Sequence, residues 1–310
     1  MRKMNRTINQ RMDPCPICGE TSFFSNPRKV KPKFIKCPIC NNYSIDPMIS
    51  FDISNSATEW MTNNIYLNEQ KLEQHFNAKF LEVAYGRILR KIQIYRKKGN
   101  LLDIGCGVGG FLGAAKKDGW IEYGVDSGSS SLIGKAMGLN IVQNDFLELD
   151  FRQDFFDVIT MIDVFEHISN PKHLLEKITT ILRPGGLVLI ITPNINGFSS
   201  RILKENWLAY QQIDHYILYS PGSIRSLFLD SNLIIQKIET NDLFVSELIM
   251  KYKTNKLDNK FRIEEQLRKR ALITVIMKYK LISNMRNLMN YFINLTQLGD
   301  RIILWITKPE

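Results

Sequence analysis

The chain has 310 residues, of which 44% are hydrophobic and 23% are charged, as in an ordinary globular protein. This length can bury one large core and still carry a small appended module. No run of about 18 apolar residues occurs, and no apolar stretch follows the basic start Met1–Arg6. The sequence therefore predicts neither a membrane-spanning helix nor a signal peptide, and we expect a cytoplasmic protein.

The formal charge of +10 is concentrated at the two ends of the chain. Residues 1–40 contain nine Lys and Arg against two acidic residues, and residues 251–310 contain thirteen against five. The middle, residues 41–250, carries 19 basic and 24 acidic residues. Basic ends suit an anionic partner, such as nucleic acid, a membrane surface or a phosphorylated substrate, and solubility alone explains them equally well.

Four of the five cysteines lie in the first 40 residues, as the pairs Cys15/Cys18 and Cys37/Cys40. Two C-x-x-C pairs with 18 residues between them are typical of a structural zinc site that four thiolates close completely. Two disulfides are the alternative, and a reducing cytoplasm disfavours them. We predict a zinc ribbon over residues 1–45 and a polar linker over residues 46–75.

The rest of the chain, residues 76–310, alternates between helical and strand patterns. Apolar residues at helical spacing predict a first helix over Phe76–Arg96. The elements predicted after it are strands over Leu101–Ile104, Tyr123–Val125, Val158–Ile162, Leu187–Ile191, Leu233–Ile238 and Arg301–Thr307, and helices over Phe111–Lys117, over Pro171–Leu182 and from Pro221. A turn at Pro184–Gly186 precedes the fourth strand. This rhythm indicates a doubly wound α/β sheet.

A basic and apolar segment, residues 260–295, interrupts the pattern before the last strand. It forms the larger part of an insertion at about residues 244–298, and its apolar residues recur at helical spacing. Such a segment suits peripheral contact with the inner face of a membrane or with a lipid-linked acceptor. A helical pair that packs on the sheet or on a second subunit explains it slightly better.

The segment Leu101–Gly109 reads as a strand that runs into a glycine loop. Glycines there let the backbone turn sharply and let a ligand lie against bare amides at a helix N-terminus. A dinucleotide is the obvious ligand, but Asp103 under the loop would repel a pyrophosphate and attract a positively charged sulfonium. Asp126 ends the next strand, where a carboxylate can accept hydrogen bonds from both ribose hydroxyls.

With these residues in place, the sequence resembles the class I S-adenosylmethionine-dependent methyltransferases, in the broad group that includes ubiquinone-biosynthesis O-methyltransferases. The resemblance runs from about Tyr66 to the C-terminus. Its motifs are Leu102–Gly109, Gly124–Asp126, Asn144–Phe146, Asp157–Ile159, Asp163–His167 and Leu182–Gly186. It implies a Rossmann-like, mostly parallel sheet whose last strand, Arg301–Thr307, is antiparallel.

The resemblance also implies which residues bind S-adenosylmethionine. Asp126 would hold the ribose, and Asp163 would lie beside the cofactor at the end of the strand Val158–Ile162. The remaining implied residues are Asp103, Gly105, Cys106, Gly107 and Gly109 at the methionine part, and Asp145 with Phe146 beside the adenine. One departure is Ser127, at a position where the family often has proline or isoleucine.

His167 is the candidate general base for a hydroxyl acceptor, because it follows the strand Val158–Ile162 and its ordinary pKa suits the task. Glu166 is a candidate to orient it, and His215 is the second-choice base. Related quinone O-methyltransferases hold a divalent metal with a Glu-His pair, so Asp163, Glu166 and His167 form an alternative metal site. In a third interpretation, Glu166 and His167 only shape the pocket.

We therefore expect a methyltransferase that acts on a hydroxyl group of a small molecule or of a lipid-linked glycan. The alternatives are an RNA methyltransferase that holds RNA with the ribbon and the basic ends, and a sugar C-methyltransferase. RNA ranks lower, because the ribbon offers only Phe23, Phe24 and Phe34 for stacking on bases. A zinc-ribbon adaptor without activity is the third hypothesis, and the intact Asp103 and Asp126 argue against it.

Overall fold

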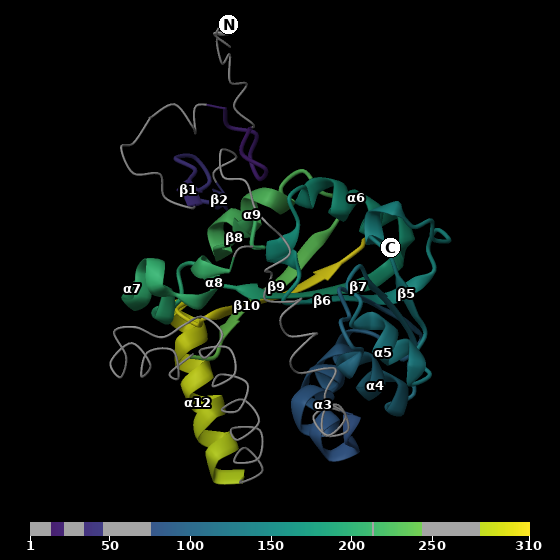
Figure 1. Cartoon of the computed structure of the whole chain (residues 1–310). Coiled ribbons are helices and arrows are strands. Elements are labelled where there is room, and N and C mark those ends of the chain that lie inside the picture. The colour runs from purple at the N-terminus through teal and green to yellow at the C-terminus, as the bar shows by residue number, and fades with distance from the viewer. Residues whose placement is uncertain (1–13, 22–33, 46–75, 213, 244–279) are drawn as a thin grey trace, which may run out of the picture.

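The computed structural model describes residues 14–21, 34–45, 76–212, 214–243 and 280–310 (Figure 1). The predicted linker and residues 244–279 of the predicted insertion lie outside this part of the chain. The described residues form one seven-stranded sheet and one three-stranded sheet. No helix among them is long and apolar enough to cross a membrane.

The seven-stranded sheet has the order β5-β4-β3-β6-β7-β10-β9. Its strands are β3 (Asn100–Ile104), β4 (Ile121–Asp126), β5 (Ile141–Gln143), β6 (Phe156–Ile162), β7 (Leu182–Pro193), β9 (Ile234–Asn241) and β10 (Arg301–Thr307). Neighbouring strands from β5 to β7 are parallel, whereas β10 runs antiparallel to both β7 and β9. The predicted mostly parallel sheet with an antiparallel last strand is thereby confirmed.

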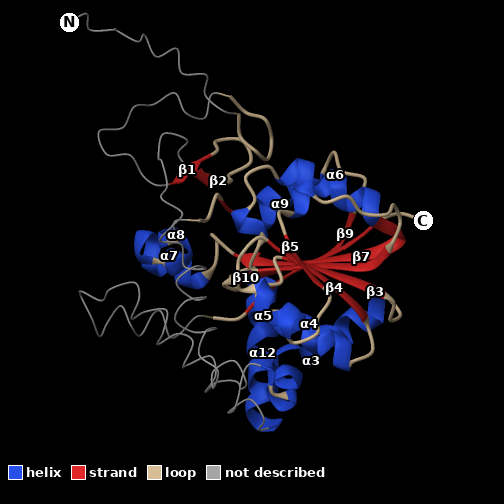
Figure 2. Ribbon diagram, turned by 45° about the vertical axis from the view of Figure 1, so that its right-hand side comes forward, coloured by secondary structure: helices blue, strands red, loops and turns tan. Residues whose placement is uncertain are grey.

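Helices cover both faces of this sheet (Figure 2). The helices α6 and α9 lie on one face, and α3, α4, α5 and α12 lie on the other. Their bounds are α3 Ala78–Tyr95, α4 Gly110–Lys117, α5 Ser131–Ala136, α6 Pro171–Ile181, α9 Pro221–Phe228 and α12 Lys280–Thr296. The short helices α7 (Phe198–Leu203) and α8 (Leu208–Gln211) follow β7, and the 3-10 turns are η4 (Phe146–Glu148), η5 (Phe165–His167) and η6 (Lys204–Asn206).

The two layers of the core follow from the alternation of side chains along the strands. Leu101 packs in one apolar cluster with Leu89 and Phe111 from the helices α3 and α4. Its neighbour Leu102 packs in the other cluster, which includes Ile178 of α6. Both leucines are fully buried, as is expected for a central parallel strand that is covered on both faces.

The strand β7 is longer than the sequence predicts. The prediction of a turn before this strand is wrong. It begins at Leu182, directly after α6 ends at Ile181. Between β6 and β7 the register steps from the pair Phe156/Leu182 to the pair Val158/Leu187, so Pro184–Gly186 form a bulge inside the strand. The strands and α-helices of the large domain that the sequence did not predict are β5, β8 (Ile217–Leu218), α5, α7 and α8, all of six residues or fewer.

The three-stranded sheet joins the N-terminal segment to the large domain. It consists of β1 (Phe34–Lys36), β2 (Tyr43–Ile45) and β8 (Ile217–Leu218), in the order β1-β2-β8. Strand β2 pairs antiparallel with both neighbours. The cysteine-containing hairpin is therefore continuous, through backbone hydrogen bonds, with a segment that lies far away in the sequence.

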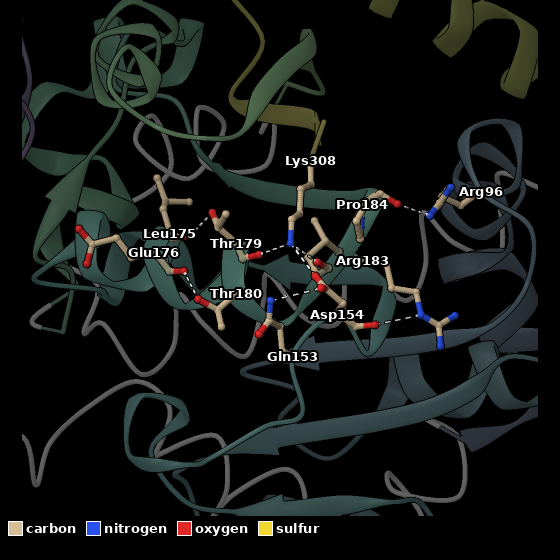
Figure 3. A network of polar contacts seen from close by, with 11 residues as sticks. Arg96, Gln153, Asp154, Leu175, Glu176, Thr179, Thr180, Arg183, Pro184 and Lys308 are labelled. Carbon is tan, nitrogen blue, oxygen red and sulfur yellow. Dashed lines mark hydrogen bonds and ion pairs between the residues drawn. The ribbon is translucent and has the colours of Figure 1, made fainter. Parts of the chain in front are cut away.

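A network of polar contacts ties the end of the chain to α6 (Figure 3). The Lys308 ammonium donates to Asp154 Oδ1 at 2.7 Å and to the carbonyls of Thr179 and Leu182, each at 2.8 Å. These carbonyls lie at the C-terminal end of α6, where the helix dipole favours a positive charge. The same network includes Arg183, whose Nε donates to the carbonyl of Asp154 at 3.1 Å.

We predict that Lys308→Met lowers the free energy of unfolding by about 1 to 3 kcal/mol, because three partners lose a charged donor. Urea denaturation measures the change. Lys172→Met is the matched control, since Lys172 is exposed at the N-terminal turn of the same helix. Equal stability of the Lys308 variant and the parent would contradict this account of the chain end.

Candidate functional site

The glycine loop connects β3 to α4 at the carboxyl end of the sheet. Gly105 has a φ of +70°, and a Cβ there would lie 2.3 Å from Val164 Cγ2, so only glycine fits. Gly107 has a φ of +53°, and a Cβ at that position would meet no atom within 4 Å, so the loop is open on that side. Cys106 is buried in the loop, and Gly109 immediately precedes α4. The loop thus presents bare backbone to a ligand.

The carboxylate of Asp126, the last residue of β4, lies against the glycine loop. This carboxylate accepts the Gly107 N–H at 2.8 Å and the Gly128 N–H at 2.7 Å. Burial raises the pKa of Asp126, while these two amide donors and the nearby His167 lower it. A carboxylate has about four acceptor positions, so capacity for further hydroxyl donors remains.

Asp103 is buried beneath the loop, with only 4% of its surface exposed. Its Oδ1 accepts the Thr160 hydroxyl at 2.6 Å. Burial raises the pKa of Asp103 to about 7; the Thr160 hydrogen bond lowers it and the Asp126 charge raises it further. A cation bound at the loop would favour the ionised carboxylate.

Asp145 and Phe146 lie just beyond β5, at the next strand end. Asp145 is exposed and its Oδ1 accepts the Leu147 N–H at 2.8 Å, which fixes the turn. The Phe146 ring is 6% exposed and packs between Phe151, at 5.5 Å between ring centroids, and the Lys177 ammonium, at 5.2 Å. Of Asp145 and Phe146, the two residues predicted to contact the adenine, Asp145 is the one with an exposed side chain.

Asp163 directly follows β6 with a φ of +57°, and its N–H donates to the Ile191 carbonyl at 2.8 Å. Its carboxylate forms an ion pair with Arg301, the first residue of β10. Arg301 was not predicted from the sequence as a site residue. Because the two residues are 138 positions apart, only the antiparallel insertion of β10 beside β7 brings them together.

A second polar cluster lies after β6, where Glu166, His167 and His215 each bring a ligand-type atom within 4.8 Å of the others. Glu166 is 1% exposed and accepts the Thr192 hydroxyl at 2.8 Å. Burial raises the pKa of Glu166 to about 7, although the neighbouring His167 lowers it. The rings of His167 and His215 meet edge to face with centroids 4.7 Å apart.

Two details of this cluster differ from the sequence hypothesis. The His167 ring is held by Asp214, whose carbonyl lies 2.9 Å and whose Oδ2 lies 3.7 Å from Nδ1, rather than by Glu166. The metal-type trio is Glu166, His167 and His215. Asp163, which the sequence hypothesis placed in that trio, is instead paired with Arg301.

The four N-terminal cysteines converge on one point. Cys15 Sγ and Cys40 Sγ are 3.7 Å apart, and Cys18 Sγ and Cys37 Sγ are 3.6 Å apart. Sulfurs around a tetrahedral zinc at about 2.3 Å lie about 3.8 Å from one another, whereas disulfide sulfurs lie at about 2.05 Å. The spacing fits four thiolates around one metal ion and not two disulfides.

A methyltransferase-domain family matches residues 73–238, which is more than half of the chain and contains the glycine loop, Asp126 and the Glu166/His167 segment. The chain belongs to this family. It is a class I S-adenosylmethionine-dependent methyltransferase, and S-adenosylmethionine is its methyl donor. Asp103 and Asp126 around an open loop suit the positive charge of that donor.

Curated relatives are also named as methyltransferases. The methyltransferase is 24% identical over 207 residues to the ubiquinone biosynthesis O-methyltransferase of Shewanella sp. (strain ANA-3), an alignment that covers 62% of this chain and 84% of the relative. It is 33% identical over 156 residues to the ubiquinone biosynthesis O-methyltransferase of Coxiella burnetii (strain RSA 331 / Henzerling II), an alignment that covers 42% of this chain and 66% of the relative.

Solved structures share the fold. A chain of the Haloferax volcanii complex between the Trm112 methyltransferase activator and a methyltransferase aligns with a TM-score of 0.51 at 16% identity, over 83% of this chain and 99% of that one. The plantazolicin methyltransferase BpumL, solved in complex with SAH, aligns with a TM-score of 0.50 at 17% identity, over 83% of this chain and 93% of that one. At these identities the likeness concerns the fold alone.

We predict that Asp103→Asn weakens S-adenosylmethionine binding tenfold or more and stabilises the cofactor-free protein. The folded pKa of about 7 lies above the ordinary value of 3.8, so the aspartate's contribution to stability is lost as the pH rises through about 7. The asparagine variant should therefore gain stability over the parent progressively between about pH 4 and pH 7, reach an advantage of about 1 to 3 kcal/mol, and keep it at higher pH. Calorimetry measures the affinity and urea unfolding measures the stability. An unchanged affinity for S-adenosylmethionine would contradict the assignment of Asp103 to the donor site.

We also predict one zinc ion per chain, bound by Cys15, Cys18, Cys37 and Cys40. Elemental analysis of the purified protein measures it, and Cys37→Ser should lower the metal content severalfold because one thiolate is lost. Cys106→Ser is the matched control, since Cys106 lies in the glycine loop and should leave the zinc content unchanged. A metal-free native protein would refute the ribbon.

Proposed function

We propose that this methyltransferase methylates a hydroxyl oxygen of a small-molecule acceptor, with His167 as the general base. The observation that supports this most is that the charge of a His167 imidazolium lowers the pKa of two carboxyl groups, Asp126 on the donor side and the buried Glu166. The names of the curated relatives, which are O-methyltransferases, support oxygen as the accepting atom.

The contact with Asp214 sets the protonation of the His167 ring. A carbonyl oxygen can only accept a hydrogen bond, so its 2.9 Å contact requires a proton on Nδ1. In the neutral ring the lone pair then lies on Nε2, which is the form that can act as a base. The Asp214 carboxylate, 3.7 Å from Nδ1, stabilises the ring when it becomes charged.

On the donor side, we assign Asp103, Gly105, Cys106, Gly107 and Gly109 to the methionine part of S-adenosylmethionine. We assign Asp126 to the ribose, Asp145 and Phe146 to the adenine, and Asp163 to the wall beside the donor. When bound, S-adenosylmethionine supplies a methyl group on a positively charged sulfur, which is already activated for transfer. The residues of the chain then have mainly to align the acceptor oxygen with that group.

On the acceptor side, His167 would accept the hydroxyl proton at Nε2, which would leave the acceptor oxygen able to take the methyl group that the bound donor would supply. Glu166 has a pKa raised by burial to about 7, so near neutral pH a fraction is ionised and can stabilise the imidazolium. His215 is only 2% exposed, and its Nδ1 contacts the Ala209 carbonyl at 2.8 Å. We therefore keep His215 as the second-choice base behind the more accessible His167.

A lipid-linked acceptor, such as a lipid-linked glycan, is the finer form of this proposal that α12 favours. Several large apolar side chains of this helix are 58–65% exposed, namely Leu288, Tyr291, Phe292 and Leu295. An amphipathic helix with such a face suits peripheral contact with a membrane surface. RNA is disfavoured as an acceptor, because Phe34 is 3% exposed and packs in an apolar cluster instead of offering its ring for stacking.

We predict that His167→Ala lowers methyl transfer by about 10²- to 10⁴-fold, the usual contribution of a general base, and leaves S-adenosylmethionine affinity within about threefold. Transfer of a labelled methyl group into fractionated cell extract, and into a panel of phenols and sugars, measures the activity and identifies the acceptor. His173→Ala is the matched control, because His173 is an exposed histidine of α6. Full turnover by the His167 variant would eliminate the base assignment.

A further inference from the structure

The hairpin that carries the second cysteine pair forms backbone pairs with the segment that follows His215. Tyr43 pairs with Leu218 and Ser44 with Ile217, and the Ile45 N–H donates to the Tyr216 carbonyl at 2.9 Å. We call the described residues 14–21 and 34–45 the cysteine ribbon, and residues 214–218 the acceptor segment. Figure 1 shows β1 and β2 beside β8.

The acceptor segment depends on partners outside itself. Its strand β8 has two residues, too few for a strand to persist without neighbours, and both are fully buried. On the side of the large domain, the Tyr216 N–H donates to the Glu166 carbonyl at 2.8 Å. The cysteine ribbon supplies the opposite side through β2. The acceptor segment is thus held between the ribbon and Glu166.

The second cysteine pair is the turn of the ribbon hairpin. Strand β1 ends at Lys36, next to Cys37, and β2 begins three residues after Cys40. Inside the turn the Cys37 N–H donates to the Asn42 carbonyl at 2.7 Å, and the Asn41 N–H donates to the Cys37 carbonyl at 3.1 Å. A metal held by these thiolates therefore fixes the geometry of the two strands that leave the turn.

Side chains of the ribbon strengthen the same connection. Phe34 of β1 packs in one apolar cluster with Trp207 and Leu218, and its ring centroid lies 5.0 Å from that of Tyr210. The neighbouring Ala209 carbonyl holds the His215 ring at 2.8 Å. The buried cysteines Cys15, Cys37 and Cys40 belong to the cluster that contains Ile217. The ribbon therefore reaches both supports of His215, residues 207–210 and β8.

We propose that the cysteine ribbon positions His215 and the acceptor segment, so that an intact ribbon is required for acceptor turnover but not for donor binding. This inference rests on the proposed assignment of His167 and His215 to the acceptor side of the site. The donor-side residues lie in or directly after the strands β3 to β6, and the hydrogen bonds of β3 and β4 run to one another, to β5 and to β6. Loss of the ribbon should release the acceptor segment and leave the glycine loop in place.

Hydrogen–deuterium exchange on the full chain tests the proposal without knowledge of the acceptor. After zinc is removed with a chelator, we expect amides in residues 208–219 to exchange at least tenfold faster, while those in residues 101–126 keep their rates. Phe34→Ala should raise exchange over residues 208–219 in the same way with its zinc content unchanged, which separates docking of the ribbon from its folding.

Two matched variants serve as controls. Ile39→Ser changes a residue of the same cysteine turn whose side chain is 65% exposed, and it should alter neither zinc content nor exchange. Phe34→Tyr keeps the aromatic ring and should restore the slow exchange of residues 208–219. Unchanged exchange after zinc removal and in Phe34→Ala would overturn the proposal. An equal rise over residues 101–126 would also overturn it, because the ribbon would then support the whole domain.

A second measurement connects the ribbon to catalysis. With an acceptor fraction from the extract assay, Phe34→Ala should lower methyl transfer at least tenfold, with S-adenosylmethionine affinity measured by calorimetry unchanged. Faster exchange without loss of transfer would refute the catalytic part of the proposal. This result is independent of the assignment of His167 as the base. If His167→Ala keeps its turnover while Phe34→Ala loses it, the base assignment is refuted and the positioning role of the cysteine ribbon is supported.

Discussion

The central strand β3 forms hydrogen bonds with β4 on one side and with β6 on the other, and the arrangement of the site depends on this pairing. The chain builds the sheet outward from β3 in one direction through β5 and then returns to add β6 on the opposite side. At such a switch point the connections that follow neighbouring strands diverge and leave space at their carboxyl ends. The glycine loop, Asp126 and Asp163 all follow strands of this region.

The position of the site carries an electrostatic consequence. Asp103 is buried near the end of β3 and Glu166 in η5, which follows β6, and burial raises the pKa of each to about 7. Both carboxyl groups keep a hydroxyl donor, Thr160 for the first and Thr192 for the second, so neither is left without a hydrogen bond. Asp103 lies under the glycine loop, which suits a positively charged ligand. Glu166 lies beside His167, which becomes positively charged when it accepts a proton.

The N-terminal ribbon shares a sheet with the large domain. Its strand β2 is the middle strand of a sheet whose third strand comes from the large domain. Small cysteine modules have little core of their own and depend on a metal for their fold. Here the hairpin also contributes Phe34 to a cluster with Trp207, so the ribbon and the region after β7 share buried surface.

The sequence by itself determined the elements and residues whose conformation and chemistry are local. The glycine loop could be predicted because the turn, the preceding strand and Asp103 are consecutive, and the four-cysteine cluster because two short turns set its spacing. The ion pair of Asp163 with Arg301, the support of His167 by Asp214 and the pairing of β2 with β8 were decided by the tertiary structure alone. Each joins residues that are 47 or more positions apart, and neither periodicity nor motif spacing carries information about which distant segments pack together.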